Sequence, residues 1–304
     1  MRVLAHIHTF NDADVIDHTI EMILRQTRPV DGILVVDNGS TDGTLDQPNL
    51  KHTTVLRHDR NLGTSGAVVS GMRFAIEHGY DWIWIFDADS SPKLDALENL
   101  MRCFTRLNPK IQSNTWWLSS LLIQDGRRLH GCNFTSRGIE MIDPRAAPSQ
   151  YPCHTNMWSG SLYRLDLVQQ VGLPNPDYVL DWGDVIYGYE GLLSGYIGFV
   201  EQSSLVVHRH HPAATLRYRR IGPRTVKVFY SPPIRCYYHW RNSTYFWLYR
   251  YAGENRAYLR VAHLVLYLKS LIKVVLLLNE RAPLTRAYLL GFWHGLHGRL
   301  TKRW

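Results

Sequence analysis

The sequence predicts an α/β fold in which a mixed, mostly parallel sheet is flanked by helices and followed by a helical C-terminal extension. Over the first two thirds of the chain, short apolar segments alternate with segments whose apolar residues recur at helical spacing. Such alternation is typical of parallel sheets, whose strands need helical crossovers. The last third lacks it, is rich in aromatic residues and contains very few acids. Two regions therefore follow, 1–210 and 211–304.

The predicted strands are short apolar runs that end in polar or turn-forming residues. They are expected at residues 3–8, 32–36, 53–57, 82–86, 116–123, 161–163 and 198–207. Helices are expected between them, at residues 12–26, 63–78, 94–107, 165–171 and 185–194. Loops are predicted for two segments. Residues 143–155 are rich in Pro, Ala and Ser, and residues 210–234 are basic and contain several prolines.

The C-terminal region is predicted to be helical from Tyr237 onward, with its longest helix at residues 258–279. Leucine and valine recur there at helical spacing, at Leu264, Leu268, Leu271, Val275 and Leu278. Lys269 and Lys273 lie on another face and Arg260 interrupts the stretch, so a membrane-spanning helix is not expected. An amphipathic helix is expected instead, either packed on the domain or lying on a membrane surface.

The charge of the chain is distributed unevenly. Residues 203–304 carry 18 Lys and Arg but only two acids, Glu254 and Glu280, whereas residues 1–202 carry 16 basic and 24 acidic residues. A basic end of this kind fits a nucleic acid, a membrane surface or a phosphorylated substrate, and a merely soluble positive face is the remaining alternative. With 45% hydrophobic and 20% charged residues, a mainly disordered chain is excluded.

The cysteines and the N-terminal residues indicate in which cellular compartment the protein is expected. Four cysteines are widely separated and include no CxxC pair, which excludes a disulfide scaffold and gives no support for a cysteine zinc site. The first residues, MRVLAHIHTF, contain no long apolar segment typical of a signal peptide. A cytoplasmic protein is the resulting expectation.

Two acidic side chains, Asp87 and Asp89, directly follow a strongly apolar predicted strand. Open α/β sheets bind their ligands beyond the carboxyl ends of their strands. Two carboxylates at such a place suit Mg²⁺ or Mn²⁺ shared with phosphates. A purely structural turn also fits this short pattern.

Two neighbouring strand ends carry residues suited to a nucleotide. The run DNGSTD at 37–42 follows the second strand, where an acid can bind a ribose or a base. The run NLGTSGA at 61–67 opens a helix, whose glycines allow close approach and whose N-terminus attracts phosphate. Together with the acids at 87 and 89, these runs predict a single nucleotide site at one edge of the sheet.

With these motifs in place, the sequence resembles glycosyltransferase family 2, whose fold is GT-A. The motifs are VVDNGSTD at 35–42, NLG at 61–63, FDAD at 86–89, SGSLY at 159–163, DWGD at 181–184 and VVH at 206–208. The resemblance covers about residues 1–210 and is nearest to the rhamnosyltransferase and galactofuranosyltransferase branch. That branch also tends to carry an aromatic segment with Arg and Asn, like YYHWRN at 237–242.

The resemblance implies a nucleotide site and a metal site. The implied nucleotide-contacting residues are Thr9, Asn11, Asp37, Asn38, Asn61, Gly63, Asp87 and Ala88. The implied ligands of Mn²⁺ or Mg²⁺ are Asp89, Asp87 and His208, and imidazole beside carboxylates is a competent donor set. The alternative for His208 is a surface histidine at a strand end.

The resemblance also implies a catalytic base, Asp184, with Asp181 as the second candidate. An inverting transfer needs a carboxylate beside the acceptor hydroxyl. The family often has a further acid two residues later, where this chain has Ile186. Trp158 and Trp182, with Asp181, are candidates for acceptor or sugar contact. The structural alternatives are capping of the following helix for the acids and buried packing for the tryptophans.

The favoured function is a metal-dependent, inverting hexosyltransferase acting on a lipid-linked or cell-surface glycan. Rhamnose from a dTDP-sugar is the first choice of donor, and galactofuranose from a UDP-sugar is the next. A sugar-nucleotide pyrophosphorylase is an alternative, but residues 6–10 lack the glycine-rich loop that it would need. A basic nucleic-acid-binding protein is the other, but no recognised motif is present, so no nucleic acid partner is expected. Peripheral attachment to the inner membrane face and a homo-oligomer stay open.

Overall fold

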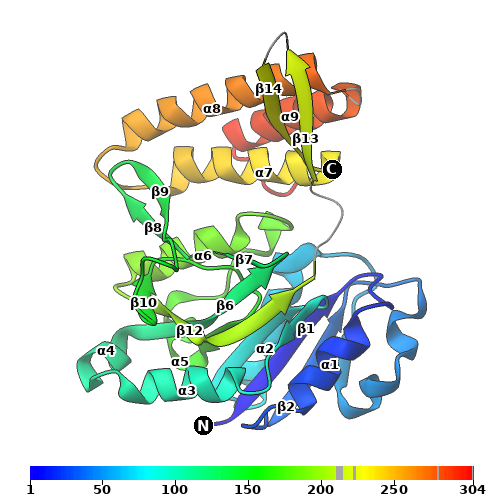
Figure 1. Cartoon of the computed structure of the whole chain (residues 1–304), viewed down its shortest axis with the longest axis vertical. Helices are drawn as coiled ribbons and strands as arrows, with labels where there is room; N and C mark the ends of the chain where they lie inside the picture. Colours follow the sequence, from blue (N-terminus) through cyan, green and yellow to red (C-terminus); the bar gives the residue numbers. More distant parts are fainter. Residues whose placement is uncertain (130, 210–214, 222–223, 279–280, 303) are drawn as a thin grey trace. The chain divides into compact units, whose positions relative to one another are not determined.

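The computed structural model describes residues 1–129, 131–209, 215–221, 224–278, 281–302 and 304 (Figure 1). The chain divides into two compact units. The first comprises Met1–Phe134, Ile139–Pro176 and Asp184–His210, and the second comprises Thr135–Gly138, Asp177–Gly183 and His211–Trp304.

The first unit is built on one mixed sheet with the strand order β10-β12-β6-β11-β4-β1-β2-β3. Its strands are β1 (Val3–Thr9), β2 (Gly32–Asp37), β3 (Thr54–Arg57), β4 (Trp82–Asp87), β6 (Thr115–Gln124), β10 (Gln150–Cys153), β11 (Ser161–Arg164) and β12 (Ile197–His208). β1 to β4 run parallel, as do β6 and β12, whereas β11 and β10 run antiparallel to their neighbours. Two short strands, β5 (Ser90–Pro92) and β7 (Arg127–Arg128), pair with β12 and β6.

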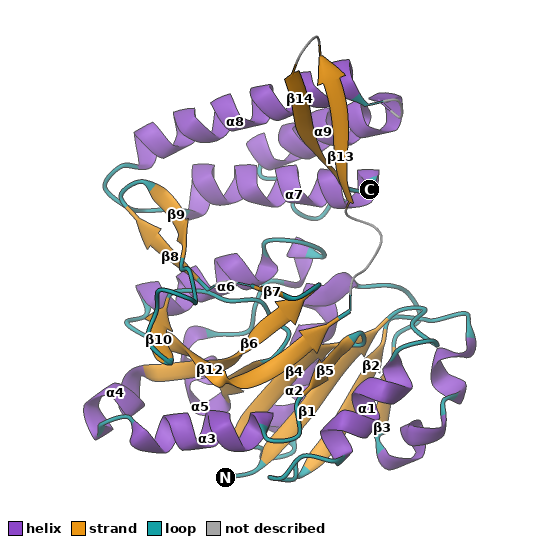
Figure 2. Ribbon diagram, viewed as in Figure 1, coloured by secondary structure: helices purple, strands orange, loops and turns teal. Residues whose placement is uncertain are grey.

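Helices cover both faces of this sheet (Figure 2). They are α1 (Ile16–Leu24), α2 (Gly63–Glu77), α3 (Ala96–Arg106), α4 (Pro109–Asn114), α5 (Leu165–Val171) and α6 (Gly183–Leu193). Because side chains alternate along a strand, Ala5 and Ile7 of β1 pack toward α1 and α3, whereas Leu4 packs toward α2. The predicted fold class, a sheet flanked by helices with a helical C-terminal extension, is confirmed.

The second unit is mainly helical. It contains α7 (Pro233–Tyr245), which continues as a π-helical turn (Phe246–Arg250), then α8 (Arg256–Leu277) and α9 (Arg281–Leu296). Its core is aromatic, and the Tyr267 and Phe292 rings stack at 4.0 Å. Gly291 and Gly295 let α9 approach α7 closely, since an added Cβ would lie within 2.5 Å of a backbone carbonyl of α7. None of the helices in the described ranges combines the length and apolar character needed to cross a bilayer.

Two of the predicted loops are partly wrong. Residues 215–221 and 224–230 form an antiparallel hairpin, β13 (Thr215–Ile221) and β14 (Arg224–Tyr230), because both segments are rich in β-branched and aromatic residues. The remaining residues 210–214 and 222–223 lie outside the described residues. Within 143–155, residues Gln150–Cys153 form β10, and its Pro152 is tolerated because β10 is an edge strand. A further hairpin is formed by β8 (Cys132–Thr135) and β9 (Gly138–Met141).

Candidate active site

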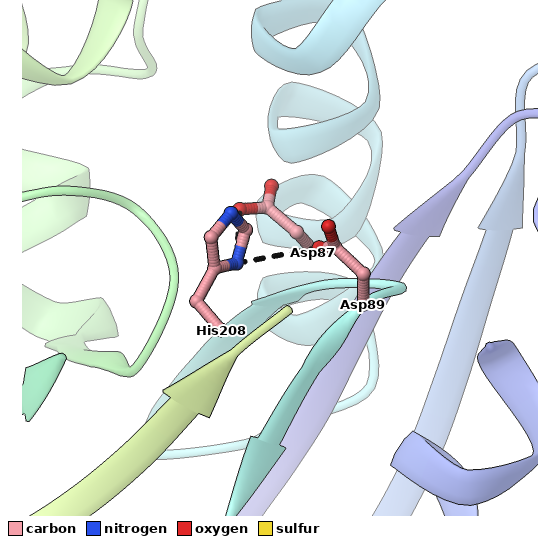
Figure 3. A group of neighbouring side chains, drawn as sticks. All are labelled: Asp87, Asp89 and His208. Atoms are coloured by element: carbon pink, nitrogen blue, oxygen red, sulfur yellow. Dashed lines mark ion pairs between the residues drawn. The ribbon is translucent and has the colours of Figure 1, made fainter. Parts of the chain in front are cut away.

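Three side chains converge beyond the carboxyl ends of β4 and β12 (Figure 3). Asp87 ends β4, Asp89 lies in the turn that follows, and His208 ends β12. The Nδ1 atom of His208 lies 3.3 Å from Oδ1 of Asp89 and 4.0 Å from Oδ2 of Asp87. One ligand atom from each residue lies within 4.8 Å of the others. The structure thus brings together the three residues expected to hold a metal.

Strand pairing fixes this convergence. The short strand β5 directly follows Asp89 and pairs antiparallel with β12, with His208 opposite Ser90. The Oγ atom of Ser90 lies 2.5 Å from Nδ1 of His208, and the backbone N–H of Arg209 donates to the carbonyl of Asp89 at 3.0 Å. Residues more than a hundred positions apart are therefore held together by the backbone.

The electrostatics of this cluster favour a cation. Burial, followed by the charge of Asp87, raises the pKa of Asp89 to about 6, and His208 partly opposes this rise. Two carboxylates in a partly desolvated site repel each other, and a divalent cation relieves both the repulsion and the desolvation. Carboxylate oxygens with one imidazole nitrogen suit Mn²⁺ or Mg²⁺. The residues present therefore fit the metal that the sequence implies.

The loops after β1 and β2 are tied together at the same edge of the sheet. Thr9 and Asp37 occupy paired positions on the two strands. The Asn11 N–H donates to Oγ of Ser40 at 2.9 Å, and the Asn11 side chain accepts from the Thr41 N–H at 2.8 Å. Asn11 adopts a positive φ of 59°, which asparagine tolerates better than most residues. These contacts preorganise the edge where the nucleotide is expected.

The other predicted nucleotide residues form a connected network of turns. The buried Asp37 carboxylate lies 3.3 Å from the guanidinium of Arg57. The Asn38 amide donates to the carbonyl of Gly63 at 3.4 Å, and the Asn61 side chain accepts from the Gly63 N–H at 2.7 Å. Gly63 has φ 76°, a conformation that glycine adopts without strain. The start of α2 is thereby fixed beside the end of β2.

Ala88 lies between the two candidate metal ligands. Its side chain is buried, and its carbonyl accepts a hydrogen bond from Oγ1 of Thr19 at 2.7 Å. This bond ties the turn after β4 to α1.

The predicted base, Asp184, lies in the first turn of α6. Its Oδ1 accepts from the N–H of Val185 at 2.8 Å, and its carbonyl accepts from Oγ1 of Thr155 at 3.1 Å. Burial, followed by the charge of Asp184, raises the pKa of the Cys132 thiol to about 11. Among the described residues, Asp184 is not part of the cluster of potential metal ligands.

The remaining candidates lie in two different settings. Trp158 is buried in the first unit, where its ring packs 5.6 Å from Tyr163 and 5.4 Å from that of Tyr187. This is the packing arrangement that the sequence leaves open as an alternative. Asp181 and Trp182 belong to the second unit and both have a positive φ, of 57° and 66°.

Within the second unit, α7 holds these two residues. The carboxylate of Asp181 lies 3.5 Å from the guanidinium of Arg235. The indole N–H of Trp182 donates to Nδ1 of His239 at 3.3 Å. The amide of Asn242 donates to the carbonyl of Asp181 at 2.8 Å. Positive φ values at non-glycine residues are strained, and these contacts maintain them.

Sequence reasoning missed several residues around Asp87. The Nε2 atom of His8 lies 2.6 Å from Oδ1 of Asp87, and the Asp87 N–H donates to Oγ of Ser159 at 3.2 Å. Asp12, whose pKa is raised by burial, accepts from Oγ1 of Thr9 at 2.8 Å. His8 is the last residue of the strand expected at 3–8, but its place beside Asp87 depends on the pairing of β1 with β4, which the sequence alone does not specify.

Comparison with known proteins agrees with this geometry. Residues 5–119 match the family model described as glycosyl transferase family 2. The chain thus contains a glycosyltransferase family 2 domain at residues 5–119. A solved structure of GalNAc-T7 with UDP, GalNAc and Mn²⁺ superimposes with a TM-score of 0.61 at 12% identity, covering 98% of this chain and 56% of that one. The predicted family and the GT-A fold are confirmed.

Three curated relatives carry names of sugar transferases. Galactofuranosyltransferase GlfT1 of Mycobacterium tuberculosis is 28% identical over 57% of this chain and 59% of its own length. The dTDP-rhamnosyl transferase RfbF of Shigella flexneri is 22% identical over 69% of both chains. Undecaprenyl-phosphate mannosyltransferase of Micrococcus luteus is 35% identical over 33% of this chain and 43% of its own. The matched part thus spans about three fifths of GlfT1.

Proposed function

We propose that this family 2 glycosyltransferase is a metal-dependent, inverting enzyme that moves a sugar from a nucleoside diphosphate sugar to a hydroxyl of a lipid-linked or cell-surface glycan. The observation that carries the proposal is the convergence of Asp87, Asp89 and His208 at the edge where the nucleotide-suited turns end. A divalent cation held by these residues supplies charge stabilisation for the leaving diphosphate.

Asp184 is the proposed base. Its carboxylate accepts the proton of the acceptor hydroxyl while the acceptor oxygen bonds to the anomeric carbon. The bond from that carbon to the diphosphate oxygen breaks on the opposite face, so the configuration inverts. Asp181 is the second candidate for this step.

For the donor, the names of the relatives support the two choices made from the sequence. One relative is named a dTDP-rhamnosyl transferase and another a galactofuranosyltransferase. We therefore propose dTDP-rhamnose first and UDP-galactofuranose second. The name undecaprenyl-phosphate mannosyltransferase supports a lipid-linked acceptor.

The second unit is proposed to attach the enzyme to the anionic inner face of a membrane. The outward face of α8 exposes a continuous apolar stripe, formed by Tyr258, Val261, Leu264, Val265, Leu268, Ile272, Val275 and Leu276. The opposite face of α8 is buried through Leu259, Tyr267 and Val274. An exposed apolar stripe on a basic region fits the headgroup boundary of anionic lipid. A second copy of the chain is the alternative partner for this stripe.

The test of the function is a panel of nucleotide sugars. Thermal unfolding of the full chain is followed with Mn²⁺ and each sugar nucleotide, and turnover is then measured with the stabilising donor. We expect one dTDP- or UDP-sugar to raise Tm only with Mn²⁺ or Mg²⁺, and EDTA to abolish transfer reversibly. Full activity in excess EDTA contradicts the metal assignment, and the absence of stabilisation by every sugar nucleotide contradicts the function.

A further inference from the structure

Two histidines, His6 and His8, occupy the same face of β1. Side chains of a strand alternate between its faces, so both lie on the side of the sheet covered by α2, whereas Ile7 packs on the other side. In the parallel register of β1 and β4, His8 is paired with Asp87. The sheet therefore places the imidazole of His8 next to a candidate metal ligand.

The two carboxylate oxygens of Asp87 have different neighbours. Nε2 of His8 lies 2.6 Å from Oδ1 of Asp87, and the His8 side chain is only 8% exposed. The other oxygen, Oδ2, is the one that faces Nδ1 of His208, at 4.0 Å. One oxygen is thus turned toward the strand and the other toward the cluster.

We infer that His8 is a positioning residue for the metal site: it holds Oδ1 of Asp87 so that Oδ2 is presented to the divalent cation. This inference rests on the proposed metal site. A carboxylate that rotates must be ordered when the cation binds, and the close ion-pair contact with His8 reduces that cost beforehand. Groups that orient metal ligands in this way commonly change metal affinity by roughly 10- to 100-fold.

His6 supplies a matched control on the same strand. It is fully buried, its ring stacks on that of His8 at 5.7 Å, and burial lowers its pKa well below the usual value of 6.5. Within the described residues, the ring nitrogens of both histidines lack a hydrogen bond of regular geometry, but the imidazole of His8 is paired with the carboxylate of Asp87 and that of His6 is not. Replacing it with leucine removes an imidazole of the same size without removing a bond to Asp87. Comparing the His6 and His8 variants therefore distinguishes the effect of losing a buried histidine from the effect of losing the contact with Asp87.

The experiment measures Mn²⁺ binding to the full chain by the EPR signal of free Mn²⁺, with and without UDP. We expect His8→Leu to weaken Mn²⁺ binding by roughly 10- to 100-fold and to alter the spectrum of the bound ion. His6→Leu is expected to bind Mn²⁺ as the wild type does. His8→Gln and His8→Asn both introduce a side-chain amide, but the two side chains differ in length. The amide nitrogen of glutamine can occupy the position of Nε2, whereas the amide nitrogen of the shorter asparagine cannot. We expect Gln to retain most of the affinity and Asn to lose it.

The outcomes distinguish the inference from the function on which it rests. If the wild type takes up no Mn²⁺, or if Asp89→Asn leaves uptake unchanged, the proposed metal site fails. If Asp89→Asn abolishes uptake while a folded His8→Leu binds like the wild type, only the role of His8 is overturned. Should His8→Leu not fold, the Gln and Asn variants decide, and equal affinity for the two overturns the role of His8.

Discussion

The two units of this chain use buried polar side chains for different purposes. In the first unit, buried or partly buried groups such as His8, Asp87 and Asp89 gather at one edge of a sheet and face one another. In the second unit, the buried Arg241 and Asn242 bond mainly to backbone carbonyls. The first arrangement gathers carboxylates that can bind a cation, whereas in the second the side-chain donors bond to the unit's own backbone. The chemistry is therefore expected in the first unit, and the second is expected to support and attach it.

Charge separates the two regions in the same way. Residues 203–304 hold 18 basic and two acidic residues, whereas acids predominate in residues 1–202. The acids needed for a cation and a base are thus found in one part of the chain. The long basic side chains and the exposed apolar stripe of α8 are found in the other.

The largest expected effect tests whether the catalytic base lies in the first unit. Asp184→Asn keeps an oxygen that can accept from the Val185 N–H, so the first turn of α6 is preserved. We expect turnover to fall by about 10²- to 10⁴-fold, the usual contribution of a general base. Binding of UDP with Mn²⁺, measured by calorimetry, is expected to be unchanged.

Asp181→Asn is the matched comparison, because Asp181 lies three residues away but belongs to the second unit. We expect a much smaller loss of turnover for it. If Asp181→Asn loses turnover and Asp184→Asn does not, the base belongs to the second unit and the division of labour between the units is wrong.

The next effect tests the structural role of the buried arginine. The guanidinium of Arg241 donates to the carbonyls of Leu300, Lys302 and Asp177, which joins three separate segments of the second unit. Arg241→Met leaves those carbonyls without their donor, and we expect a loss of about 3 kcal/mol in the free energy of unfolding. Urea denaturation followed by tryptophan fluorescence measures it.

The control for this variant is Arg256→Met, at an exposed position of α8, which is expected to change stability by less than about 0.5 kcal/mol. Mn²⁺ binding by the first unit is expected to survive in both variants. Loss of Mn²⁺ binding in a folded Arg241→Met protein contradicts the view that Arg241 serves only the second unit.

Much of the first unit could be predicted because its strands are apolar runs with polar ends. β1 and β4 were expected to within one residue of their observed bounds, and Asp87 and Asp89 stand out as a pair. His208 came from the resemblance, because pairing between β5 and β12 is a long-range event that local sequence does not specify. His8 was missed because its meaning depends on the register between β1 and β4.

The second unit was harder to predict for a related reason. The positive charges and flanking prolines of β13 and β14 favour a loop, so they conceal the β-forming residues that pair in the hairpin. The contiguous DWGD motif also gives no sign that Asp181 and Asp184 belong to different units. That division depends on bonds such as the one from Asn242 to the carbonyl of Asp181, which join residues 61 positions apart.

The smallest expected effect tests whether the basic charge of the second unit acts at a surface. Lys269 and Lys273 are exposed on α8, beside its apolar stripe. Each lysine near an anionic bilayer contributes about 1 kcal/mol, so replacing both with glutamine should weaken binding by roughly 10- to 30-fold. Co-sedimentation with vesicles of phosphatidylcholine and phosphatidylglycerol measures this, and added salt should reduce the difference.

The control is the double variant Lys51→Gln with Lys110→Gln, which removes the same charge from exposed positions of the first unit and should have no such effect. If both double variants weaken binding equally, net charge rather than α8 governs attachment. If the wild type stays in the supernatant at low salt, the apolar stripe does not face a membrane and a second copy of the chain becomes its partner.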